Sequence, residues 1–229
     1  MKIKWGALVV DGRNKIGGQV ASKNRAGAYL RNKVTPVNPS SANQVTVRAR
    51  LGSLSQAWRG LSAVQRSAWN AAVGDYSKTD IFGDIRNPSG FNLFVRLNAN
   101  LVNAGESQIN TPPSPVAVPV LSSFTLAAAE GTPALEATVA PADIAANTKI
   151  LAFATAPQSP GKSYVKAEYR QISVVDTYAL GSIDLLSAYQ AKFGSVSPAG
   201  NKIFVKLVHV STVTGQTSQA QEASAIIAA

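Results

Sequence analysis

The chain has 229 residues, 45% of them hydrophobic and 15% charged, enough to bury the core of one large domain or two small ones. It has no cysteine, which excludes a disulfide framework and a thiolate metal site. Its net charge of +10 is concentrated at one end, where residues 1–50 contain ten Lys and Arg against a single Asp. This end is expected to meet an anionic partner or to stay solvated.

Residues 1–38 predict a basic extended arm with β-hairpin character. Residues 5–10, 19–23 and 28–33 are candidate strands, and Asp11-Gly12 is a hairpin signal. The arm is glycine-rich and poor in large apolar side chains, so its own burial cannot offset its chain entropy. We therefore expect the arm to become ordered against neighbouring chains. Two prolines make residues 34–39 an extended connector.

The stretch 39–74 predicts a helical hairpin. Apolar residues recur there at steps of four, three, four and three, which places them on one face of an α-helix. They are Val47, Leu51, Leu54, Trp58 and Leu61. The arginines of this stretch fall largely off that face and are either solvated or part of a ligand surface. They are Arg48, Arg50, Arg59 and Arg66.

Capping residues mark the ends of the predicted helices. Ser41 with Gln44, and Ser62 with Gln65, fit the S-x-x-Q capping box, and Gly74 is expected to end the second helix. A third helix is expected from residue 89, after a solvated polar loop at 75–87. Residues 39–109 thus form a small three-helix unit. Its predicted core contains Leu51, Leu54, Trp58, Leu61, Trp69, Phe94 and Leu97.

The C-terminal half predicts an antiparallel β-sandwich of immunoglobulin or fibronectin type. Residues 110–119 contain four prolines and are read as a linker. Short β segments separated by turn signals then occupy 120–229, at 120–127, 134–140, 149–156, 163–175, 201–211 and 219–227. A short helix is expected within 182–193. The predicted fold class is α+β, with boundaries at 1–38, 39–109, 110–119 and 120–229.

The sequence contains no catalytic constellation. Residues 156–163 match a loose phosphate-loop pattern, but a strand rather than a helix is expected to follow, and Pro157 and Pro160 remove two cradling amides. His209 is the only histidine, which leaves a zinc site or a catalytic triad without the usual partners, and a strand histidine is the expected role. We predict no enzyme activity, no metal and no cofactor.

Residues 12–105 resemble an N-terminal module found in structural proteins of tailed bacteriophages and related prophage regions. The resemblance lies in Arg31 with Lys33, Thr35-Pro-Val-Asn-Pro39, Gln44, Arg48, Ala57-Trp58, Leu61-Ser62, Gln65-Arg66, Ala68-Trp69-Asn70, Pro88-Ser-Gly90, Phe94 and Leu97-Asn98. An immunoglobulin-like domain behind such a module is similar to the layout of many virion surface proteins. The resemblance implies a virion component, without fixing its position in the particle.

These features indicate two alternative functions. The first is a non-enzymatic virion structural protein, a head accessory, neck or tail component that forms homo-oligomers and contacts other virion proteins through its N-terminal half. The alternative is a DNA-binding or packaging-associated protein that uses the basic arm. The expected location is the virion, after synthesis in the bacterial host cytoplasm, and no apolar stretch reaches the length of a membrane span. The candidate contact residues are Arg13, Lys15, Lys23, Arg25, Arg31, Lys33, Arg48 and Arg50.

Overall fold

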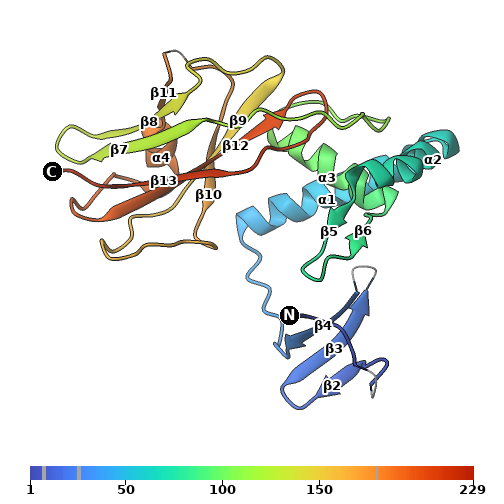
Figure 1. The fold of residues 1–229 in the computed structure, drawn as a ribbon. Helices are drawn as coiled ribbons and strands as arrows, with labels where there is room; N and C mark the ends of the chain where they lie inside the picture. Colours follow the sequence, from blue (N-terminus) through green and yellow to red (C-terminus); the bar gives the residue numbers. More distant parts are fainter. Residues whose placement is uncertain (7–8, 25–26, 179) are drawn as a thin grey trace. The chain divides into compact units, whose positions relative to one another are not determined.

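The protein has an α+β fold, as the sequence predicts (Figure 1). A computed structural model describes residues 1–6, 9–24, 27–178 and 180–229, which contain four α-helices and four antiparallel sheets. The chain divides into two compact units. The first combines Met1–Ala49 with Ser77–Asn87, and the second combines Arg50–Tyr76 with Pro88–Ala229.

The first unit is built on a four-stranded sheet in the order β1-β4-β3-β2. Its strands are β1 (Lys2–Ile3), β2 (Asn14–Ile16), β3 (Gln19–Asn24) and β4 (Gly27–Asn32). The last two match the strands expected at 19–23 and 28–33. We refer to these four strands as the N-terminal sheet.

Two local predictions about the N-terminal sheet are wrong. The turn that joins β2 to β3 is made at Gly17-Gly18, where Gly17 has a φ of +58°, and not at Asp11-Gly12. Gly12 instead lies flat against the Trp5 indole, where a Cβ atom would come within 2.4 Å of the ring. The strand expected at 5–10 is also absent from the described part of that stretch, because β1 ends at Ile3; residues 7–8 lie outside the described residues.

Residues 78–86 form a hairpin, here called the 78–86 hairpin, in which β5 (Lys78–Thr79) pairs with β6 (Ile85–Arg86). The sequence predicts a solvated polar loop here. The Asp80 side chain instead accepts hydrogen bonds from the Phe82 and Asp84 amides at 2.8 and 3.1 Å. It is only 2% exposed, so this carboxylate organises the turn from inside it.

The first unit has almost no hydrophobic core. Among its described residues, Ala21 is the one buried apolar side chain, at 2% exposure, and none belongs to a buried hydrophobic cluster. Large apolar side chains of the unit are instead exposed, including Ile16, Val34, Val37, Ile81 and Ile85. Backbone hydrogen bonds and ion pairs, rather than apolar burial, hold this unit in shape.

The second unit begins with a helical part that packs around aromatic side chains. It contains the C-terminal half of α1 (Ala42–Gly60), α2 (Ala63–Ala71), the 3₁₀ helix η1 (Ala72–Tyr76) and α3 (Gly90–Asn103). Trp69 is completely buried, with its ring centre 5.4 Å from that of Phe94. The other predicted core residues that the structure buries are Leu54, Leu61, Phe94 and Leu97, with Trp58 partly buried.

Leu51 does not belong to the core, which corrects the sequence prediction. Its side chain is 50% exposed, and Val47, one turn earlier, is 63% exposed. The aromatic contacts of α1 are made by Trp58, whose ring packs against Phe91 and Phe94 of α3 at 5.8 and 5.5 Å. Leu51 lies seven residues before Trp58, roughly 10 Å along the helix, and so lies beyond these contacts.

The predicted helix ends are confirmed in part. Ser62 and Gln65 form both hydrogen bonds of a capping box, whereas Ser41 only accepts from the Gln44 amide, at 3.4 Å. The helix expected from residue 89 is α3, and the Ser89 side chain caps it by accepting from the Asn92 amide. Gly74 does not end the second helix, because α2 ends at Ala71 and the chain continues directly into η1.

The rest of the second unit is a β domain made of two sheets, an arrangement compatible with a β-sandwich. One sheet has the order β10-β9-β12-β13 and the other β11-β8-β7. Their facing sides share one buried apolar cluster that includes Leu135, Ile150, Tyr189, Ile203 and Leu207. The strands are β7 (Ser123–Ala129), β8 (Ala134–Ala140), β9 (Thr148–Ala154), β10 (Arg170–Val175), β11 (Ser182–Asp184), β12 (Lys202–Ser211) and β13 (Gln221–Ile226).

One predicted strand of the β domain is shorter than expected, whereas the predicted short helix is confirmed. The strand expected at 163–175 is formed only by β10, and residues 163–169 are irregular. The short helix expected within 182–193 is confirmed as α4 (Leu186–Phe193), which ends at Gly194 and follows β11. Close to the C-terminus, the chain also pairs in parallel with the end of β7: the Glu130 amide donates to the Ala228 carbonyl, and the Ala228 amide to the Ala128 carbonyl, both at 2.9 Å.

The proline-rich segment 110–119 is anchored at several points within the second unit. On the helical side, the Trp69 indole donates to the Asn110 carbonyl and the Tyr76 hydroxyl to the Pro113 carbonyl, both at 2.8 Å. On the β side, the Val116 amide donates to Gln216 and the His209 ring to the Pro119 carbonyl, also at 2.8 Å. That this segment links two domains stays a prediction, as do the predicted domain boundaries at 1–38, 39–109, 110–119 and 120–229.

Candidate functional site

The first unit, which contains the N-terminal sheet, carries most of the net charge of the protein. The first unit contains eleven Lys and Arg against three Asp, a net charge of +8 out of +10 for the whole chain. A surplus of this size within 60 residues creates a positive potential that attracts anions. We therefore take this sheet and the adjoining 78–86 hairpin as the candidate functional site.

The strand register sorts the cations between the two faces of the sheet. Directly paired residues of antiparallel strands point to the same face, and successive residues alternate. Lys15 pairs with Val20, and Val20 with Arg31, so these three form one row. Tyr29, two residues before Arg31, lies on that face in a second row with Lys2 and Ser22. Lys23 lies on the other face, beside Ala28.

A cluster of unpaired cations follows from this register. Lys33 comes two residues after Arg31, and its amide still bonds the Gly18 carbonyl at 2.8 Å. Lys15, Arg31 and Lys33 are exposed, and none forms an ion pair with any residue that the structure describes. We call the surface formed by Lys15, Val20, Tyr29, Arg31 and Lys33 the basic face.

The other predicted contact residues do not join the basic face. Arg13 forms an ion pair with Asp11 at 3.2 Å. Arg48 donates to Asn38 at 2.8 Å, and Arg50 belongs to the second unit, where it donates to Asn103 at 2.9 Å. Lys23 is on the opposite side of the sheet, and Arg25 lies outside the described residues. Sequence alone could not make this division, because it depends on strand register for Lys23 and on tertiary contacts for Arg48 and Arg50.

Beside the basic face, a network of five charges ties the N-terminus to the 78–86 hairpin. Asp80 contacts Lys2 at 3.6 Å and Arg86 at 3.3 Å, while Asp84 contacts Lys4 at 3.0 Å and Arg86 at 3.2 Å. None of these five residues is among the contact residues predicted from the sequence. They lie about eighty positions apart, and nothing in the local sequence indicates that they meet.

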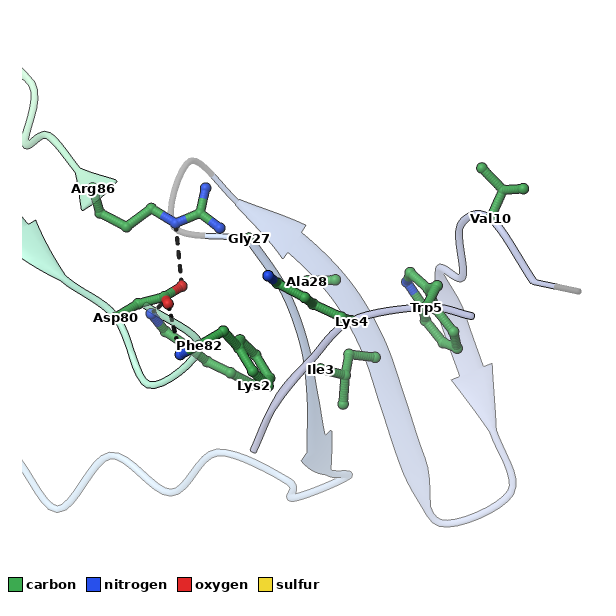
Figure 2. A pocket seen from close by; sticks show the side chains of 10 residues that line it. All are labelled: Lys2, Ile3, Lys4, Trp5, Val10, Gly27, Ala28, Asp80, Phe82 and Arg86. Carbon is green, nitrogen blue, oxygen red and sulfur yellow. Dashed lines mark hydrogen bonds and ion pairs between the residues drawn. The ribbon is translucent and has the colours of Figure 1, made fainter. Parts of the chain in front are cut away.

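The network forms one side of a pocket of about 270 Å³ (Figure 2). In Figure 2, Asp80 and Arg86 lie on one side of the pocket, and Trp5 and Val10 on the other. The Trp5 indole nitrogen is buried and has no acceptor among the described residues. Each of the three cations that line the pocket is already paired with a carboxylate, so the pocket offers an apolar wall rather than a free charge.

Asp80→Asn should loosen the 78–86 hairpin, and acid should do the same to the parent protein. Burial by itself would raise the pKa of Asp80, but the hydrogen bonds from Phe82, Asp84 and Arg86, with the Lys2 charge, lower it below its ordinary value. Because the folded-state pKa is the lower one, this carboxylate stabilises the fold above the unfolded value of about 3.9, and the stabilisation is lost as the pH falls through the folded value.

The amide resonances of Phe82 and Asp84 report this step in an NMR titration. In the parent protein they should move together with a midpoint below the ordinary aspartate pKa, and in Asp80→Asn they should already lie near their acid-state positions at neutral pH. A midpoint at or above the ordinary value would contradict this account of the hairpin.

The two motifs weighed in the sequence do not form sites. No helix follows the Pro160-Gly161 turn, and Lys162 is held by Glu168 at 2.9 Å, an ion pair that lowers the pKa of Glu168 to about 2. His209 lies in β12, where its Nδ1 donates to the Pro119 carbonyl and burial lowers the pKa of the ring. Among the described residues, no three His, Cys, Asp or Glu side chains gather as metal ligands would.

Comparisons with other proteins add no assignment. No family model, curated protein or solved structure matches this chain. Within the described part of the chain, none of the helices combines the length and the apolar character that a membrane crossing requires.

Proposed function

We propose that this chain is a non-enzymatic structural protein of a tailed-bacteriophage virion, a head accessory, neck or tail component that assembles through its N-terminal half. Its partners are further copies of itself and other virion proteins. It is made in the cytoplasm of the bacterial host and then incorporated into the particle. The proposal starts from the module that residues 12–105 resemble.

The near absence of a core in the first unit carries the proposal. Ordering backbone costs roughly 1–2 kcal/mol per residue, and buried apolar surface is the main term that offsets this cost. The unit buries Ala21 but exposes Ile16, Val34, Val37, Ile81 and Ile85. A surface of this kind gains stability when a partner covers it.

The edge formed by β2 is poorly suited to pairing with another chain, so we expect the N-terminal sheet to contact its partners through its faces and loops. The edge strand β2 has only three residues, all of them exposed, with Lys15 at its centre. Two copies paired antiparallel along this edge about Lys15 would bring their Lys15 side chains together. Short edge strands that carry lysine are a known protection against such pairing.

We also propose that the β domain has the immunoglobulin-type strand order. If β7 and β8 are strands A and B, and β9 and β10 are C and C′, then β11, β12 and β13 become E, F and G. The observed orders β11-β8-β7 and β10-β9-β12-β13 read E-B-A and C′-C-F-G, which is the immunoglobulin arrangement without strand D. A neutral domain of this type suits display or lateral contacts on a particle.

Removal of residues 1–38 tests the assembly role. We expect the shortened chain to keep the helices and the β domain, to be found as a monomer by light scattering, and to be missing from purified particles. The physical reason is the loss of the N-terminal sheet, which leaves the 78–86 hairpin without Lys2 and Lys4. Normal incorporation of the shortened chain would overturn the proposal.

Substitutions in the full-length chain test the same assembly role without deleting a folded segment. Ile16→Thr, Ile81→Thr and Ile85→Thr change exposed side chains of the first unit, while Val64→Thr, Val116→Thr and Val213→Thr change equally exposed side chains of the second. Only the three substitutions in the first unit should reduce incorporation into particles. If the three substitutions in the second unit reduce it equally, exposed apolar surface in general, and not the first unit, drives association.

A further inference from the structure

We propose that the basic face binds the phosphate backbone of double-stranded DNA. The inference deepens the proposed function, because it names the partner of one surface of the unit through which the chain is proposed to assemble. It rests on Lys15, Val20, Tyr29, Arg31 and Lys33, which three different segments bring to one side of the N-terminal sheet.

The first step is that the charges of the basic face are uncompensated. The three carboxylates of the first unit are used elsewhere, because Asp11 pairs with Arg13 while Asp80 and Asp84 hold Lys2, Lys4 and Arg86. No carboxylate lies in the register rows of the basic face. The carboxylates of the unit therefore leave the cations of the basic face available to an external anion.

The second step is geometric. Lys15 and Arg31 stand on either side of Val20, two strands apart, which separates their backbones by roughly 10 Å. Both side chains are long and exposed, so their charges can reach different phosphates of one backbone. The planar guanidinium of Arg31 suits a bidentate contact with phosphate oxygens, and a lysine acts as a mobile point charge beside it.

The third step distinguishes DNA from an acidic protein surface. A protein interface of high affinity is built around a buried apolar or aromatic anchor with its charges kept to the rim, whereas on the basic face Val20 and Tyr29 stand among three unpaired cations. A phosphate backbone needs no such anchor, since release of its counterions supplies the free energy. The contact is therefore expected to be independent of base sequence.

The test measures binding of the full-length protein to a fluorescent random-sequence duplex of about 20 base pairs across a salt series. If three phosphates are neutralised, the slope of log K against log salt is about −2.7, so affinity falls roughly 40-fold between about 50 and 200 mM salt. The variant with Lys15→Gln, Arg31→Gln and Lys33→Gln should lose nearly all of this slope, about one unit for each side chain.

The control variant carries Arg13→Gln, Lys23→Gln and Arg48→Gln. It removes the same charge from the same unit, but from side chains that are paired or on the opposite face. It should keep most of the slope, with affinity within about threefold of the parent. An equal loss in both variants would overturn the proposal and show that net charge alone matters. No binding by the parent at about 50 mM salt would also overturn it.

Two further measurements distinguish DNA from an acidic protein partner and DNA binding from assembly. Poly-glutamate at equal charge concentration should compete much more weakly than unlabelled DNA, and equal competition would assign the basic face to an acidic protein instead. Incorporation of the two variants into particles is scored separately. A parent that enters particles but binds no DNA contradicts only the DNA inference, whereas a parent that binds DNA but is missing from particles contradicts only the structural function.

Discussion

Trp69→Ala is expected to lower the free energy of unfolding of the second unit by about 3–5 kcal/mol, the range for removal of a fully buried large aromatic side chain. Trp69 has no exposed surface, packs edge-on against Phe94, and donates its indole hydrogen to the Asn110 carbonyl. The substitution therefore opens a cavity and leaves a carbonyl without its donor. Urea denaturation followed by circular dichroism measures the loss.

Two variants separate these contributions. Trp69→Phe keeps a ring in the cavity but removes the hydrogen bond, so part of the loss should return. Trp58→Ala should cost clearly less than Trp69→Ala, because Trp58 is only partly buried against Phe91 and Phe94. If Trp58→Ala proves the more damaging of the two, the assignment of Trp69 as the centre of the helical core is wrong.

Asn98→Ala is expected to lower the free energy of unfolding by about 2–4 kcal/mol, since buried polar groups that lose their partners cost about 1–3 kcal/mol each. The Asn98 side chain is completely buried on α3. Its amide nitrogen donates to the carbonyls of Phe94 and Ile109 at 3.1 and 3.2 Å, and its oxygen accepts from the Ile109 amide at 2.7 Å. The substitution removes the clamp on the segment after α3.

Hydrogen exchange at the Ile109 amide gives a local test that stability alone cannot give. That amide should exchange slowly in the parent protein and quickly in Asn98→Ala. Asn103→Ala serves as the control, because Asn103 lies on the same helix but is partly exposed and accepts only from Arg50. An unchanged exchange rate at Ile109 in Asn98→Ala would mean that Asn98 does not hold this segment.

Features set by neighbours in the chain could be predicted from the sequence. The Ser62–Gln65 capping box, the Ser89 cap and the strands β3, β4, β8 and β12 each depend on side-chain spacing over a few residues. The basic character of the N-terminal half also follows from composition. These elements agree because local propensity and tertiary packing favour the same conformation.

Features set by distant contacts could not be predicted. Leu51 has helical spacing as good as that of Leu54, yet Leu54 is buried and Leu51 is not, a difference that depends on what packs against each side chain and not on spacing. The placing of Lys15 and Arg31 on one face of the sheet and of Lys23 on the other depends on the register of β2, β3 and β4. The link between Lys4 and Asp84 joins residues 80 positions apart. A pattern of neighbouring residues does not indicate contacts between residues that are far apart in the sequence.

The parallel pairing of Ala228 with the end of β7 has a mechanical consequence. Both segments run in the same direction, one near the start of the β domain and the other at its end. A force that pulls these two ends apart acts along the strands and loads the bonds made by the Ala228 amide and carbonyl in shear. Bonds loaded in this way must break together, whereas a hairpin pulled from its open end loses them one at a time.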